Sequence, residues 1–90
     1  MTYPSLTKLR SFAAIAAHRS FRKASAQMNL SQPALSAHIR DLERELGVAL
    51  FSRTTRSVRL TAEGESLLHR ARRVLEDLNA AVLEVRSGRS

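Results

Sequence analysis

The sequence predicts a mainly α-helical fold, made of a compact helical body followed by one long helix, on three observations. Apolar residues recur at helical spacing in four stretches, and each stretch follows a serine or threonine suited to an N-cap. Residues 51–60 alternate apolar and polar side chains, as a β-hairpin does. The last stretch has an unbroken heptad pattern, which is typical of helices that pair. With 90 residues, the chain can build one small core.

The first two predicted helices are short and follow each other closely. Ser5 caps a helix whose apolar positions begin at Leu6 and which ends near Arg19. Ser20 caps a second helix of about two turns. This helix stops at Asn29, which tolerates the left-handed backbone conformation. Residues 29–31 therefore predict a tight turn into the next helix.

The third predicted helix has two unlike faces. Ser31 caps it, and Gly47 ends it as a C-terminal cap. Its apolar face carries Leu35, Ile39, Leu42 and Leu46. The opposite face is small and polar in its N-terminal half and has no acidic residue; it carries Gln32, Pro33, Ser36, Ala37 and Arg40. Such a face suits close approach to another molecule, because a solvated helix face usually alternates charges.

The last predicted helix begins after Thr61 and extends over about 25 residues, or roughly 37 Å. The body touches only its first turns, so a second chain is expected to cover its apolar seam. The residues predicted to form this homodimer interface are Leu68, Ala71, Leu75, Leu78, Val82 and Val85. Folding of the helix back onto its own body is the alternative. The expected organisation is a body at residues 1–60 and a dimerisation helix at residues 61–90.

The charge balance favours a polyanionic partner. The formal net charge is +7, from 15 Lys and Arg against 8 Asp and Glu, and residues 1–40 contain no acid. The chain has no cysteine, no phosphate-binding glycine loop and no clustered metal ligands, so we expect no cofactor, no metal and no enzyme activity. Asp41, Glu43 and Glu45 are expected to point to different sides of one helix rather than to form an acid/base pair. No apolar run is long enough for a bilayer, and a cytoplasmic protein is expected.

Two short helices joined by a tight turn, the second with a small polar outer face, form a helix-turn-helix. The segment that carries it is SFRKASAQMNLSQPALSAHIRDLE, residues 20–43. It resembles the LysR-type transcriptional regulators, and the likeness continues through ELGVALFSRTTRSVRLTAEGESLL. The resemblance implies a winged helix-turn-helix, with a three-helix core and a β-hairpin wing, that binds double-stranded DNA as a dimer at an interrupted inverted repeat. It also implies a small-molecule effector, sensed by a domain outside this chain.

The DNA contacts follow from the resemblance and from side-chain chemistry. The residues expected to read bases in the major groove are Gln32, Pro33, Ser36 and Ala37. Arg56, at the tip of the predicted hairpin, resembles the wing arginine that enters the minor groove. Phosphate contacts are expected from Arg22, Lys23, Ser31, Arg40, Arg53, Thr54 and Arg59. His38 lies at the edge of the apolar face. We interpret it as a packed or solvated histidine rather than as a phosphate contact.

Two other functions fit the same basic surface. A non-specific architectural protein would grip phosphates and bend DNA, and an interaction module would bind an acidic protein. The outward face of glutamine, proline and serine, rather than lysine and arginine, favours sequence-specific readout.

Overall fold

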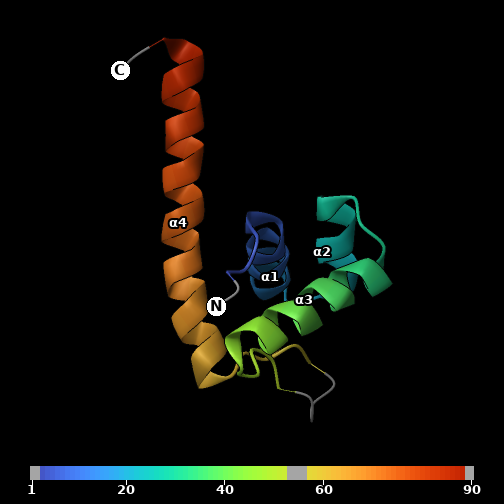
Figure 1. Ribbon diagram of the computed structural model, residues 1–90. Helices are drawn as coiled ribbons and strands as arrows, with labels where there is room; N and C mark the ends of the chain where they lie inside the picture. Colours follow the sequence, from blue (N-terminus) through green and yellow to red (C-terminus); the bar gives the residue numbers. More distant parts are fainter. Residues whose placement is uncertain (1–2, 53–56, 89–90) are drawn as a thin grey trace.

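A computed structural model describes residues 3–52 and 57–88, and it confirms the predicted helices (Figure 1). The helices are α1 (Leu6–His18), α2 (Phe21–Met28), α3 (Gln32–Leu46) and α4 (Ala62–Ser87). Each begins after a predicted cap, whose side-chain oxygen accepts a hydrogen bond from the backbone N–H three residues on; the caps are Ser5, Ser20, Ser31 and Thr61. Because capping is a local interaction, the starts of all four helices could be predicted from the sequence.

The helices α1, α2 and α3 pack around one core. Its fully buried apolar side chains are Phe12, Ile15, Ala24, Leu35, Ile39, Leu42 and Leu50. Phe51, which follows α3, closes this core, with its ring centroid 5.4 Å from that of Phe12 and 6.1 Å from that of Phe21. The segment after α3 is therefore part of the body rather than a loose connection.

The turn between α2 and α3 has the predicted geometry. Asn29 ends α2 in the left-handed conformation, with φ of 56°. The backbone N–H of Leu30 donates to the carbonyl of Ser25 at 3.0 Å, and the Leu30 side chain packs against the core. The turn thus fixes α3 across α2, as a helix-turn-helix requires.

The structure shows the base of the predicted hairpin. Phe51 and Leu60 form an antiparallel bridge, and the N–H of Ser52 donates to the carbonyl of Arg59 at 2.9 Å. A carboxylate oxygen of Glu43 accepts from the N–H of Leu50 at 2.7 Å, which ties the first strand position to α3. The remaining predicted hairpin residues, Arg53, Thr54, Thr55 and Arg56, lie outside the described residues.

The start of α4 is held tightly against the body. The Thr61 hydroxyl donates to the carbonyl of Ala49 at 2.6 Å and accepts from the N–H of Gly64 at 3.0 Å. A Cβ on Gly64 would lie 2.1 Å from the carbonyl oxygen of Leu50, so only glycine permits this approach. Further along, Leu67 and Leu68 pack against the core, and Ala71 is buried.

The distal part of α4 extends away from the body (Figure 1), and the molecule measures 48 × 30 × 19 Å along its principal axes. No helix in residues 3–52 and 57–88 is both long and apolar enough to cross a membrane.

Candidate nucleic-acid interface

The exposure of α3 follows the predicted division into two faces. On the inner face, Leu35, Ile39 and Leu42 are at most 1% exposed. On the outer face, Gln32 and Pro33 are exposed at the start of the helix, and Arg40 is exposed two turns later. Ser36 and Ala37 are half-buried between them, so only a closely apposed molecule can touch them. The geometry offers an accessible amide at the helix start, above a surface of small side chains.

Basic side chains flank this outer face. Arg22 and Lys23 are exposed in the first turn of α2, whose N-cap is Ser20. The Ser25 hydroxyl donates to the carbonyl of Arg22 at 2.8 Å, and Ser25 itself is buried against the neighbouring helices. Arg59 is exposed at the base of the hairpin. The predicted phosphate-binding residues of the described part of the chain are thus all accessible, and their contacts with DNA stay a prediction.

Ser31 is the N-cap of α3, and its hydroxyl oxygen is already engaged within the protein. Its hydroxyl oxygen accepts from the N–H of Ala34 at 3.1 Å, and its side chain is exposed. A hydroxyl has a second lone pair and one donor proton, so the cap leaves Ser31 able to donate to a phosphate.

The acidic residues of α3 all lie in its C-terminal half, away from Gln32. The expectation that they point to different sides is wrong for Asp41 and Glu45, which lie one turn apart and both face Lys8. The Lys8 ammonium is 2.8 Å from Glu45 Oε2 and 3.9 Å from Asp41 Oδ2. Arg44 pairs with the other oxygen of Asp41 at 3.3 Å. These carboxylates are compensated within the body, so the N-terminal half of α3 keeps its positive surroundings.

His38 belongs to the packing between α1 and α3. Its Nδ1 is 2.8 Å from the hydroxyl oxygen of Ser11, a side chain that is fully buried. This pair was not predictable from the sequence, because a serine within an apolar helix face does not indicate which residue on another helix it will contact. Glu43 and Thr61, which fix the base of the hairpin, were also missed as positioning residues.

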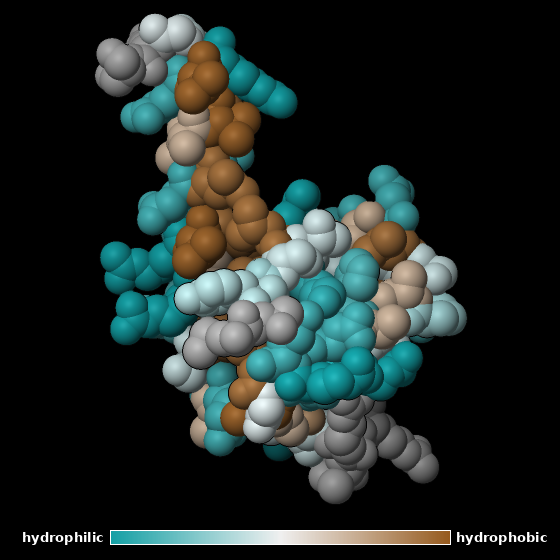
Figure 2. Space-filling model, in the orientation of Figure 1, coloured by the Kyte–Doolittle hydropathy of each residue, from teal (hydrophilic) through white to brown (hydrophobic). Residues whose placement is uncertain are grey.

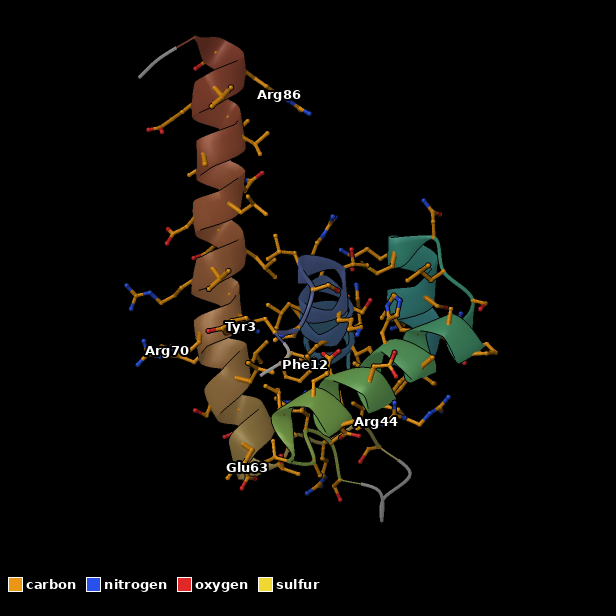
Figure 3. All side chains as sticks on the ribbon, in the orientation of Figure 1. Tyr3, Phe12, Arg44, Glu63, Arg70 and Arg86 are labelled. Carbon is orange, nitrogen blue, oxygen red and sulfur yellow. The ribbon has the colours of Figure 1, made fainter. Side chains whose placement is uncertain are left out.

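The seam of α4 divides into a covered part and a free part. Ala71 is 2% exposed and Leu68 is half-buried against the core, so their own chain covers Ala71 and part of Leu68. Leu78 is 42% exposed and Val85 is 79% exposed. Figure 2 shows the resulting apolar stripe along α4 above the body. Arg70 and Arg86 point away on opposite sides of the helix (Figure 3). Leu75 is half-buried and the seam residues after it are exposed, so the predicted dimer interface can use the seam from Leu75 onward.

Comparison with protein families gives a match over most of the chain. Residues 6–65 match the family described as bacterial regulatory helix-turn-helix protein, lysR family. A probable hydrogen peroxide-inducible genes activator from Streptomyces viridosporus is 52% identical over 81 residues, which cover 90% of this chain and 26% of that protein. The chain thus spans much less than two thirds of this relative.

Solved structures agree with the family match. Full-length OxyR from Pseudomonas aeruginosa superposes with a TM-score of 0.90 at 35% identity, over 98% of this chain and 30% of that protein. The DNA-binding domain of BenM, solved in complex with catB site 1 DNA, superposes with a TM-score of 0.88 at 35% identity, over 92% of both chains. The four helices of this chain therefore have the arrangement of a domain that has been solved on DNA.

Proposed function

The chain belongs to the lysR family of bacterial regulatory helix-turn-helix proteins, and we propose that it binds a specific double-stranded DNA sequence as a homodimer. It is the DNA-binding domain of a LysR-type transcriptional regulator and not an enzyme. In the proposal, α3 enters the major groove and the hairpin reaches the adjacent minor groove. The observation that carries it is the accessible, acid-free N-terminal half of α3.

The base-reading roles follow from side-chain chemistry. The Gln32 side-chain NH2 can donate to N7 of adenine while its carbonyl oxygen accepts from the N6 amino group, which is a bidentate pairing. Ser36, one turn further, can bond a base or a phosphate, and the apolar surfaces of Pro33 and Ala37 suit thymine methyl groups. Because Ser36 and Ala37 are half-buried, the helix must lie deep in the groove for them to make contact.

Phosphate contacts fix the register of the domain on the duplex without reading sequence. The proposed residues are Arg22, Lys23, Ser31, Arg40, Arg53, Thr54 and Arg59. Arg56 is proposed to enter the minor groove, where a narrow A·T tract has an enhanced negative potential. Support comes from the exposure of the described members of this set and from the DNA complex of the BenM domain.

The dimer is proposed to form through the free part of the α4 seam, which comprises Leu75, Leu78, Val82 and Val85. Two domains related by a two-fold axis match an inverted repeat, with a spacing set by the distance between the two recognition helices. Sensing of a small-molecule effector is assigned to the part of the longer relatives that this chain does not span. We expect the protein to act in the cytoplasm, where the DNA is.

The test begins with selection of bound sites from random duplex DNA, followed by gel shifts on the selected and scrambled sites at one stated salt concentration. Gln32→Ala should relax the preference at one base pair per half-site by about 1–3 kcal/mol. Gln27→Ala is the matched control, because Gln27 on α2 bonds the ring of His18 rather than facing outward from α3. Equal losses of Gln32→Ala on selected and scrambled DNA would show that Gln32 does not read bases.

A further inference from the structure

A groove of about 890 Å³ lies beside the base of the hairpin, on α1 and the first turns of α4. It shares Arg59 with the proposed DNA surface, and the rest of its lining has no role in the proposed DNA contacts or in the dimer seam beyond Leu75. Its floor is apolar and includes Phe51 and Leu68, which belong to the packing of the body. Its exposed rim is basic and comprises Arg19, Arg59, His69 and Arg72. Glu65 is the acid of this lining. Segments distant in the sequence thus form one amphipathic concavity with a basic rim.

The rim arginines are not neutralised within the described part of the chain. The ion pairs there join Lys8 and Arg44 to the acids at the C-terminal end of α3, and none includes Arg19, Arg59 or Arg72. Three guanidinium groups around one concavity raise the local positive potential, and the groove walls focus it. Guanidinium groups bind carboxylates with paired, charge-assisted hydrogen bonds. The rim therefore favours an anionic ligand.

The groove faces a different direction from the seam of α4 beyond Leu75, although Leu68 of the proximal seam lies on its floor. Glu65, His69 and Arg72 follow one another at spacings of four and three residues, so they share one face of the helix. Arg72 is next to Ala71, which lies in the seam, and adjacent helix positions are about 100° apart around the axis. A second chain on the seam beyond Leu75 leaves this face of α4 open.

We propose that this groove binds an acidic segment of another protein, one that also carries at least one large apolar side chain. An extended acidic segment can place its carboxylates on Arg19, Arg59 and Arg72 while an apolar side chain contacts the half-buried Leu60 and Leu68 on the floor. A DNA duplex is a broad convex rod with its phosphates on the outside, so it can touch the rim but does not extend a large apolar side chain to the floor. The combination of apolar floor and basic rim is what selects a protein segment over nucleic acid.

The test uses fluorescence anisotropy of the 90-residue chain with a labelled 12-residue peptide of glutamates around two central leucines. Arg72→Glu should weaken binding of this peptide by about fivefold to tenfold, because it removes one rim charge and adds repulsion. Arg73→Glu is the matched control: Arg73 is the exposed next residue, carries the same charge and does not line the groove. It should change the affinity by less than about twofold. Circular dichroism confirms that both variants keep their helices.

A second peptide, with the two leucines replaced by serine, tests the floor. It should bind at least about threefold more weakly than the leucine peptide, since the apolar contact is lost. Equal binding of the two peptides, equal effects of Arg72→Glu and Arg73→Glu, or no binding at millimolar concentration would overturn the proposal. So would a loss of duplex DNA affinity in Arg72→Glu with unchanged peptide binding, because the groove would then be an extension of the DNA surface.

Discussion

The three-helix body and the distal half of α4 use the same sequence pattern and reach opposite outcomes. In the body, apolar residues at helical spacing are covered by their own chain, and Phe12 and Leu35 are 0% exposed. In distal α4 the same spacing leaves Val82 38% and Val85 79% exposed. Helical periodicity therefore predicts which face of a helix is apolar, but not whether the same chain or a second chain covers it. The difference separates residues that fold the protein from residues available to assemble it.

The junction between the two regions is closely packed and hydrogen-bonded. Thr61 bonds both the loop before the hairpin and the first turn of α4, and Gly64 brings the helix backbone against the carbonyl of Leu50. The direction of α4 is consequently fixed by the same segment that carries the base of the hairpin. In a dimer, the pairing of the two seams would therefore set the distance between the two DNA-contacting surfaces.

The largest expected difference between the body and distal α4 is in their response to a large-to-small substitution. Phe12→Ala should lower the free energy of unfolding by about 3–5 kcal/mol, because it leaves a cavity among buried rings. Val85→Ala should change it by less than about 0.5 kcal/mol, since Val85 is exposed. Urea unfolding followed by circular dichroism measures both. Similar losses in the two variants would mean that distal α4 is part of the cooperative body.

The second prediction concerns assembly. Leu78→Asp should weaken the dimer by on the order of 3 kcal/mol, because it places an unpaired carboxylate in the proposed interface. The body should keep its helices, since its core does not contain Leu78. Light scattering gives the mass, and salt dependence of DNA binding should become shallower in the monomer. Ala80→Asp, on the opposite side of α4, is the control. A dimer of unchanged mass in Leu78→Asp would contradict the proposed seam.

The third prediction concerns the close contact between the start of α4 and the body. Gly64→Ala should cost about 1–3 kcal/mol of stability, because the added Cβ would lie 2.1 Å from the carbonyl oxygen of Leu50 and the backbone must shift. Ser66→Ala, at an exposed position two residues on in the same helix, should have almost no effect. The urea midpoint of each variant decides the matter. A stable Gly64→Ala protein would show that α4 can move relative to the body without cost.

The smallest expected effect is on the cap of α3. Ser31→Ala should cost about 1 kcal/mol of stability, because the N–H of Ala34 loses its acceptor. Ser31→Asp restores a good cap but places a negative charge at the proposed DNA surface. It should therefore keep the stability and lose DNA affinity in gel shifts. DNA binding by Ser31→Asp at the level of the unaltered chain would argue against a phosphate near the start of α3.

Local features of the fold were predictable from the sequence, and contacts between distant residues were not. The caps Ser5, Ser20, Ser31 and Thr61 and the left-handed Asn29 depend on neighbours within a few residues. The pairing of His38 with Ser11 and of Lys8 with Glu45 depends on how α1 crosses α3. Asp41 and Glu45 are four residues apart, so helical spacing alone places them on one face and was enough to correct the expectation that they point to different sides. Spacing along α3 does not show that Lys8 lies opposite both of them, because that depends on how α1 crosses α3.

By itself, the sequence determined the four helices, their ends, the two faces of α3 and the presence of a seam on α4. These follow from hydrogen bonds and side-chain periodicity within single elements. Only the tertiary structure decided where the seam becomes free, because burial of Leu68 and Ala71 depends on how far the body reaches along α4. It also brought Arg19, Arg59 and Arg72 around one groove. Their juxtaposition is set by the packing of α1 and the hairpin base against α4, a long-range arrangement that no local pattern specifies.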